Sequence, residues 1–375
     1  MISDLRIENF KCFTSLRLSL GALTLLTGFN AAGKSSALQP LLLLAQAAKL
    51  NLRHEPYSLN GALVRLGSVG DVLPTGTQRA DFRVGLTTEA GTLTWTMQCR
   101  AGDRQVQLRE LLLETPDGSS APAPSSVEEQ LFHTLSGVSF VGAVRGMLAD
   151  AYPIPDADHQ GWADVGVDGR FAAFWYARRA DDELVAARRC PGEATATSLR
   201  QHANAWFATL FPGAQIHARL DPDFAGVHLQ FRTSDTGEWR RPSNVGYGLS
   251  YAFPVLVALL TAAPGQLVVV DSPEAHLHPK AQSAMGHMLA AFAAAGVQIV
   301  VETHSDHLLN GIRLAVKEGV LAPPDRLTTH FFTGATAQGH GVISPVIDRK
   351  GNLSDWPTGF FDQAERDLAT LAGWE

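Results

Sequence analysis

The eight residues GFNAAGKS at positions 28–35 fit the pattern G-x-x-x-x-G-K-[ST]. The apolar stretch ALTLLTG (22–28) leads into them with the pattern of a strand, and SSALQPLLLLAQAAKL (35–50) follows with that of a helix. The backbone amides of such a loop surround phosphate groups at the positive end of a helix. The stretch therefore predicts a P-loop in a nucleotide-binding α/β domain.

The pattern also assigns a role to each residue of the loop. Lys34 is expected to reach the β and γ phosphates of ATP, and the hydroxyl of Ser35 is expected to ligate Mg²⁺. The other residues predicted to contact the nucleotide are Gly28, Asn30, Ala31, Ala32, Gly33 and Ser36. The competing interpretation is a glycine-rich turn with an exposed lysine, which leaves its place between strand and helix unexplained.

A second apolar strand ends in a carboxylate. The stretch LVVVDSPEAHLHP (267–279) runs from four apolar residues into Asp271. A P-loop needs such a carboxylate at the end of a neighbouring strand, so we expect Asp271 to hold Mg²⁺ together with Ser35. A metal-dependent hydrolase is the alternative, because histidines alternate in this stretch like metal ligands. Its site would consist of His276, His278, Asp271, His304 and Asp306.

Two further stretches lie at the ends of elements. VQIVVETHS (297–305) places His304 just after another apolar strand, where its imidazole could contact the γ-phosphate. SNVGYGLSYAFP (243–254) places Gly246, Gly248 and Ser250 at a helix start, which is a second anion-binding end. One nucleotide does not need two such ends in one subunit, so we expect the second to serve the nucleotide of a partner copy.

The remaining patterns predict the organisation of the chain. Helices alternate with continuous apolar strands in the last third, as in a parallel sheet covered on both faces. The predicted fold is α/β, with a mainly parallel sheet, an added antiparallel layer and an inserted lobe. Strands are expected at 2–10, 22–28 and, as an alternating set, 78–115, helices at 127–136 and 195–211, a loop at 115–126 and a hairpin at 213–239. The expected segments are 1–77 and 241–335 for the nucleotide-binding head, 78–240 for the antiparallel strands and inserted lobe, and 336–375 for a C-terminal module.

The order of these stretches carries a resemblance to a known group. IENFKCF (7–13), the P-loop, the glycine-serine helix start, DSPEAHLHP and THS follow one another as in the ABC-type ATPase heads of recombination, SMC and overcoming-lysogenization-defect (OLD) proteins. Within that AAA group the chain most resembles stand-alone bacterial ATPases with a C-terminal module called DUF3696. The stretches that carry this closer likeness are 59–73, 140–146 and GNLSDWPTGFFDQAERDL (351–368).

The resemblance implies further roles. The stretch with Gly246, Gly248 and Ser250 would be the signature motif, which in such heads contacts the γ-phosphate bound to the opposite subunit. Residues 275–278 would form the D-loop, His304 would be the switch histidine, and Lys11 resembles a basic residue that often lies near the nucleotide. Asp71 and Gln78 are the candidates for the Q-loop. ATP would join two copies head to tail into a homodimer, and hydrolysis would reopen it.

The sequence departs from these relatives beside Asp271. Most such heads have the glutamate that orients the attacking water directly after this aspartate, where the chain has Ser272. Glu274 stands two residues later, beyond Pro273, and replaces that base only if the loop curls back. We therefore expect a slow ATPase with Glu274, Asp271 and His304 as catalytic residues. A nucleotide-dependent scaffold with little hydrolysis remains the alternative.

The composition and charge of the chain limit which partners can be expected. The 375 residues include 37 acidic and 30 basic ones, mostly interleaved, so no broad cationic face for DNA follows from the totals. The resemblance implies a DNA-linked or anti-phage-defence switch that acts through a separately encoded effector protein. Three distant cysteines, the absence of a signal pattern and the shortness of the apolar runs predict a cytoplasmic protein that does not enter a membrane.

Overall fold

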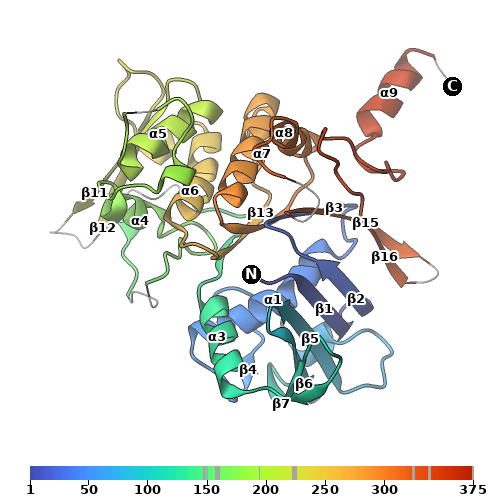
Figure 1. Ribbon diagram of the computed structural model, residues 1–375. Coiled ribbons are helices and arrows are strands. Elements are labelled where there is room, and N and C mark those ends of the chain that lie inside the picture. Colours follow the sequence, from blue (N-terminus) through green and yellow to red (C-terminus); the bar gives the residue numbers. More distant parts are fainter. Residues whose placement is uncertain are drawn as a thin grey trace.

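The computed structural model describes residues 1–373 except 147, 148, 150, 157–160, 194, 222–225, 323–325, 337 and 338. Two sheets dominate this α/β structure: a central sheet and, below it in Figure 1, a sheet formed by the N-terminal part of the chain. A third, smaller sheet lies in a lobe at one side. Among the described residues, no helix combines the length and the apolar composition of a bilayer span.

The central sheet contains the strands with continuous apolar sequences. Its order is β16-β15-β3-β14-β13-β9, in which β16 is antiparallel to β15 and all other neighbours are parallel. The parallel sheet predicted for the last third of the chain is therefore confirmed. The strands are β3 (Leu23–Gly28), β9 (Ser139–Val141), β13 (Leu267–Asp271), β14 (Gln298–Glu302), β15 (Leu327–Thr336) and β16 (Gly339–Ile343).

Helices and the N-terminal sheet cover the two faces of the central sheet. On β13, Val268 and Val270 pack into the core with α6, α7 and α8, whereas Leu267 and Val269 pack into the core with α1 and the N-terminal sheet. Successive side chains of a strand point to opposite faces, so a strand buried on both faces is apolar throughout. The helices are α1 (Lys34–Lys49), α2 (Val69–Val72), α3 (Ser125–Ser136), α4 (Ala172–Arg179), α5 (Leu199–Leu210), α6 (Tyr247–Thr261), α7 (Pro279–Ala294), α8 (Asp306–Lys317) and α9 (Gln363–Leu371).

The N-terminal sheet corrects one expectation. The segment 11–21, expected as a connection, contains strand β2, in which Phe13, Leu16 and Leu18 are buried between exposed residues. The sheet also contains strands from both of the expected segments 1–77 and 78–240, because β1 pairs with β5. Most of the loop expected at 115–126 is confirmed, although it includes β8. The strands are β1 (Asp4–Phe10), β2 (Phe13–Ser19), β4 (Tyr57–Ser58), β5 (Asp81–Thr88), β6 (Gly91–Gln98), β7 (Gln105–Glu114) and β8 (Ser120–Pro122).

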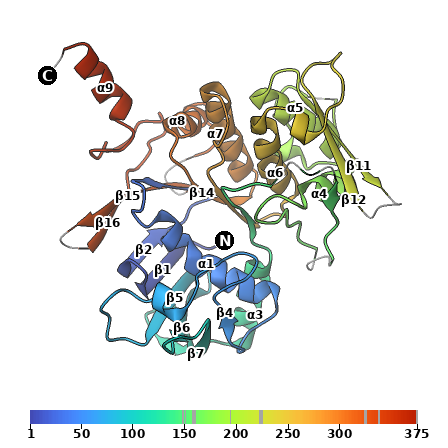
Figure 2. The ribbon, with the colours of Figure 1, turned by 180° about the vertical axis from the view of Figure 1, so that it is seen from behind.

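The lobe at the side is built from the inserted part of the chain. Helices α4 and α5 and a three-stranded sheet lie beside α6 (Figures 1 and 2). Tyr176 and Phe231 both contact the ring of Phe253. The predicted hairpin is confirmed as β11 and β12. The lobe therefore supports the helix whose start was predicted to be the signature motif. Its strands are β10 (Tyr152–Pro153), β11 (Gln215–Asp221) and β12 (Gly226–Arg232).

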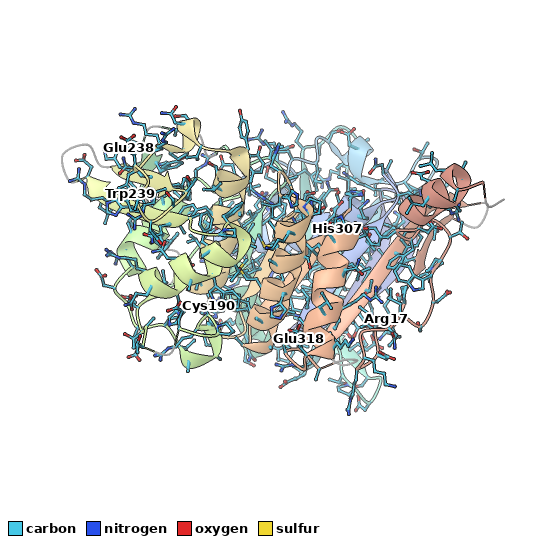
Figure 3. The ribbon with its side chains drawn as sticks, turned by 90° about the horizontal axis from the view of Figure 1, so that it is seen from above. Arg17, Cys190, Glu238, Trp239, His307 and Glu318 are labelled. Atoms are coloured by element: carbon cyan, nitrogen blue, oxygen red, sulfur yellow. The ribbon has the colours of Figure 1, made fainter. Side chains whose placement is uncertain are left out.

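Two glycines let α7 and α8 pack closely. A Cβ at Gly311 of α8 would overlap the backbone of Ser283, and a Cβ at Gly286 of α7 would overlap the backbone of Leu308. The helices run side by side in Figure 3, and Glu318, labelled there, accepts a hydrogen bond of 2.9 Å from His287 of α7. Since α7 follows Asp271 and α8 follows His304, this contact fixes the two loops relative to each other.

We expect Gly311→Ala to lower the free energy of unfolding by roughly 1–3 kcal/mol, the usual cost of overpacking, because backbone rather than a flexible side chain lies in the way. Chemical denaturation measures it. Gly70→Ala is the matched control, because the nearest atom to its new Cβ would lie at an ordinary 3.6 Å. Equal stability of the two variants would contradict the close helix contact.

Candidate functional site

Two glycines shape the loop between β3 and α1. Gly28 has a φ of 132° and Gly33 a φ of 103°, in the left-handed region that favours glycine. A Cβ at Gly28 would overlap the carbonyl of Phe332, and one at Gly33 would lie 2.7 Å from the ring of Phe13. The loop therefore needs glycine at both ends, as the P-loop pattern requires.

Lys34 is folded back onto this loop. Its ammonium group donates to the carbonyl oxygens of Phe29, at 2.9 Å, and Gly28, at 3.3 Å. Burial lowers the pKa of Lys34, and the nearby carboxylates of Glu302 and Asp271 oppose that shift. Phosphate oxygens accept stronger, charge-assisted hydrogen bonds than carbonyls do, so a nucleotide could displace both partners.

A cavity of about 470 Å³ opens over the loop. It brings together most of the nucleotide contacts predicted from the sequence, including Lys11 and His304. Gly28 and Asp271 lie beside it rather than in its wall, and the Q-loop candidates Asp71 and Gln78 are not among the described residues that line it. Asp71 instead accepts hydrogen bonds from Ser68 at the start of α2. The lining residues are Lys11, Cys12, Asn30, Ala31, Ala32, Gly33, Lys34, Ser35, Ser36, Glu302 and His304.

Two carboxylates stand at the edge of the central sheet beside this cavity. Asp271 ends β13 and Glu302 ends β14, and the parallel register pairs the two residues. Asp271 accepts a hydrogen bond of 2.8 Å from the hydroxyl of Ser272. The hydroxyl of Ser35 donates to Glu302, with both carboxylate oxygens at 3.0 Å. The strand ends thus face the start of α1.

Glu302 was missed in the sequence, although its signal was present. Like Asp271, Glu302 is a carboxylate that ends an apolar strand. Its position directly before the THS stretch left it without a predicted role. Burial, and then repulsion from Asp271, raise the pKa of Glu302 to about 7. This carboxyl group therefore takes up a proton far more readily than an exposed glutamate.

The donor atoms at this edge fit the magnesium ion that the resemblance implies. Ser35 offers a hydroxyl, and Asp271 and Glu302 offer carboxylates, all hard oxygen donors of the kind that Mg²⁺ prefers. Such ions are commonly held by one or two carboxylates together with the phosphates of the nucleotide. The remaining coordination positions would then belong to ATP and water.

The loop after Asp271 does curl back. Ser272 has a φ of 50°, and the amide of Ala275 donates to the carbonyl of Ser272, so the chain turns sharply. Glu274 reaches the end of β14, where its Oε1 accepts a hydrogen bond of 2.8 Å from the amide of His304. Its Oε2 is buried and has no partner among the described residues. Burial raises the pKa of Glu274.

His304 lies between this glutamate and the P-loop. Burial, and then the positive charge of Lys34, lower the pKa of His304, so its imidazole is neutral at physiological pH. A neutral imidazole can donate one hydrogen bond from one ring nitrogen and accept one at the other. It lines the phosphate cavity on the side of Glu274, where a switch histidine is expected.

The structure does not support the metal-dependent hydrolase. The ring of His276 packs against Tyr251, with centroids 4.4 Å apart, and Nδ1 of His278 accepts from the amide of Lys280 at the start of α7. In the described part of the chain no three His, Cys, Asp or Glu side chains converge into a metal site. His276 therefore packs against an aromatic ring and His278 caps α7.

The predicted signature stretch forms the start of α6, with one correction. Gly246 is the exposed N-cap, and nothing lies within 4 Å of the Cβ it would carry. Gly248 is half-buried, and its Cβ would lie 2.9 Å from the carbonyl oxygen of His276. Ser250, expected to contact a partner's phosphate, is 0% exposed. It lies one turn into the helix, on the face that packs into the core.

A buried arginine holds this helix to the Asp271 loop. Arg145 donates to the carbonyl oxygens of Asp271, at 2.6 Å, Ser272, at 3.1 Å, and Tyr251, at 3.1 Å. Burial lowers the pKa of Arg145 to about 10. No carboxylate among the described residues bonds it directly. The stretch FVGAVRG was noted in the sequence only as part of the resemblance, because nothing local reveals these distant partners.

The C-terminal segment forms a wall next to the P-loop. A Cβ at Gly359 would overlap the ring of Phe29, and Phe29 packs on Phe331 of β15 with ring centroids 5.5 Å apart. Phe360 is buried beneath, against Phe331 and Trp356. From this turn α9 projects away from the rest of the chain (Figures 1 and 2).

The fold is that of a P-loop NTPase of the ABC-ATPase head type, and solved structures share it. An SMC head bound to the C-winged helix domain of ScpA matches with a TM-score of 0.51 at 13% identity, over 93% of this chain and 98% of that one. An SMC head with an extended coiled coil, bound to the C-terminal domain of ScpA and derived from Pyrococcus furiosus, matches with a TM-score of 0.51 at 12% identity, over 99% of both chains. At these identities the likeness shows the fold alone.

The chain belongs to the family described as "AAA domain, putative AbiEii toxin, Type IV TA system", whose sequence model matches residues 23–310. Residues 323–371 match the family described as "Protein of unknown function (DUF3696)". The predicted AAA-type relationship and the C-terminal module are thus confirmed, and the module begins before residue 336. None of the curated proteins matches the chain.

The raised pKa of Glu302 has a consequence for stability. Between the ordinary carboxyl pKa near 4.5 and the value of about 7, the folded protein holds a proton that the unfolded chain has released. The free energy of unfolding of the metal- and nucleotide-free protein should therefore fall as pH rises through this window, by on the order of 3 kcal/mol from this group. Denaturation of the parent and of Glu302→Gln across pH isolates the contribution of Glu302, because the other titrating groups are common to both proteins. If the two proteins lost stability in parallel as pH rises, the raised pKa of Glu302 would be contradicted.

Proposed function

We propose that this chain binds and hydrolyses Mg-ATP and acts as a nucleotide-dependent switch. One observation supports the proposal above all: a P-loop lysine and serine line one cavity with Glu302 and His304, and Asp271 ends the strand next to Glu302. Each side chain comes from a separate stretch of sequence, and a glycine-rich turn without function would not bring them together.

The residues have distinct tasks in this proposal. Lys34 exchanges its carbonyl partners for phosphate oxygens, and Ser35 and Asp271 hold Mg²⁺, which neutralises charge on the phosphates. Glu274 orients the attacking water through the carboxylate oxygen that has no partner, and His304 donates to the γ-phosphate. The bond from Glu274 to the amide of His304 ties these last two residues together.

We further propose that two copies close head to tail over two ATP molecules. The exposed start of α6 at Gly246 is an anion-binding helix end with open space around it, and it does not line the phosphate cavity of its own subunit. Gly246, and Gly248 within the turn, would complete the partner's site. Within one chain, His276 stacks on Tyr247 and Tyr251 and so links this helix start to the D-loop.

For the biological role we infer a cytoplasmic switch for a DNA-linked or anti-phage-defence effector encoded separately. The family description names a putative toxin of a toxin–antitoxin system, and both SMC heads above were solved with a second protein, ScpA. A nucleotide-dependent scaffold with little hydrolysis is the second candidate, because Ser272 stands where a carboxylate is expected.

Glu274→Gln tests the catalytic assignment. Glutamine keeps an oxygen to accept from the amide of His304 but cannot serve as a base, so turnover should fall by roughly 10²-fold or more while ATP binding persists. Phosphate release and calorimetry measure the two effects. Lys34→Ala is the control that should lose ATP binding itself. A parent turnover at background would favour the scaffold, and equal turnover in parent and Glu274→Gln would remove Glu274 from the mechanism.

Gly246→Asp tests the partner's use of α6. The site is better than Gly248, where a side chain would collide with the chain's own D-loop. A negative charge at Gly246 should repel the partner's γ-phosphate and prevent ATP-driven dimerisation, which light scattering detects, without affecting binding to its own P-loop. Gly246→Ala, which adds a side chain but no charge, is the matched control.

A mixture of two inactive variants tests the composite site more directly than either variant alone. In a heterodimer of Gly246→Asp and Lys34→Ala, one composite site keeps both an intact P-loop and an intact helix start. Partial ATPase activity should therefore return when the two inactive proteins are combined. Gly246→Asp protein that still dimerises with ATP would show that this helix start does not complete the partner's site.

A further inference from the structure

We propose that Glu302 is a protein ligand of the nucleotide's Mg²⁺, beside Ser35 and Asp271. The proposal rests on the binding of Mg-ATP proposed above. It assigns a role to a residue that lies outside the P-loop pattern and outside the D-loop stretch.

The strand order places Glu302 at the centre of the site. β14 lies between β3, which leads into the P-loop, and β13, which ends in Asp271. Register pairs Glu302 with Leu26 of β3 on one side and Asp271 on the other. Parallel neighbours lie about 4.8 Å apart, so the last residue of the middle strand is within side-chain reach of both groups expected to hold the metal.

The distances to Ser35 match those between metal ligands. Mg²⁺ takes octahedral coordination with oxygens at about 2.0–2.1 Å, so adjacent ligand oxygens are about 2.9 Å apart. The hydroxyl oxygen of Ser35 lies 3.0 Å from each carboxylate oxygen of Glu302. The two side chains therefore already have the separation of neighbouring ligands in an octahedral shell, and the metal would replace the hydrogen bond between them.

Burial gives a second, independent argument. Glu302 is only 6% exposed, and no ion pair joins it to a cationic side chain in the described part of the chain. The ammonium group of Lys34 donates to the carbonyls of its own loop instead. A buried carboxylate that has no direct ion pair is costly, and a divalent cation at Ser35 would compensate for it better than the more distant charge of Lys34 does.

The structure favours a metal ligand over a second general base. Both oxygens of Glu302 face Ser35, the predicted ligand on the metal side of the cavity. Glu274 is the carboxylate that reaches His304, on the side where the attacking water is expected. Glu302 would therefore hold the metal together with Asp271, and Glu274 would orient the water.

The test measures metal affinity without turnover. Mn²⁺ replaces Mg²⁺, and its free concentration is followed by electron paramagnetic resonance in the presence of a non-hydrolysable β,γ-imido analogue of ATP. Glu302→Gln should weaken Mn²⁺ binding by roughly 10–100-fold. Glu274→Gln, the matched control with the same chemical change one loop away, should bind Mn²⁺ as the parent does. Glu302→Asp, which keeps the charge, should restore part of the affinity.

Nucleotide binding in EDTA separates this proposal from the one on which it rests. Glu302→Gln should bind the metal-free analogue at least as well as the parent, which also shows that it is folded. If the parent binds the analogue neither with nor without metal, the proposed ATP site itself fails. If the parent binds it and Glu302→Gln has unchanged or tighter Mn²⁺ affinity, Glu302 is not a ligand. Equal loss of Mn²⁺ in Glu274→Gln would likewise overturn the division of tasks.

Discussion

The register of three parallel strands is the constraint on which the site depends. β3, β14 and β13 end at one edge of the central sheet, and the pairing of Asp271 with Glu302 aligns their last residues. Side chains alternate between faces along a strand, so a slip of one residue would turn a carboxylate away from the P-loop. The apolar residues of both cores specify the register. Their packing therefore determines where Asp271 and Glu302 lie at the edge of the sheet.

The guanidinium group of Arg145 connects this edge of the sheet to α6. Arg145 leaves the end of β9 and bonds carbonyls of the Asp271 loop and of α6, three segments that are far apart in the sequence. Because its partners are backbone groups, the arginine fixes the path of the chain rather than the position of one side chain. The start of α6 and the loop that carries Glu274 are therefore held in one arrangement.

The sequence predicted what depends on local pattern and missed what depends on distant partners. The P-loop, the strand ending in Asp271 and the hairpin of the lobe carry short-range periodicity, and the structure has all three. Strand β2 was missed because its alternation is short and begins beside a turn. Ser250 was misplaced because a helix start does not reveal which face packs inward, and Glu302 needed the order of the strands.

The contact between Gly359 and Phe29 joins the parts of the chain that match two different family models. Phe29 of the P-loop lies within the AAA-type part of the chain and Gly359 within the module of unknown function, and a Cβ at Gly359 would displace the ring of Phe29. A larger residue at either position needs a compensating change at the other. Across related chains we therefore expect these two positions to vary together, and a module placed on another head would need a matching side chain at the position of Phe29.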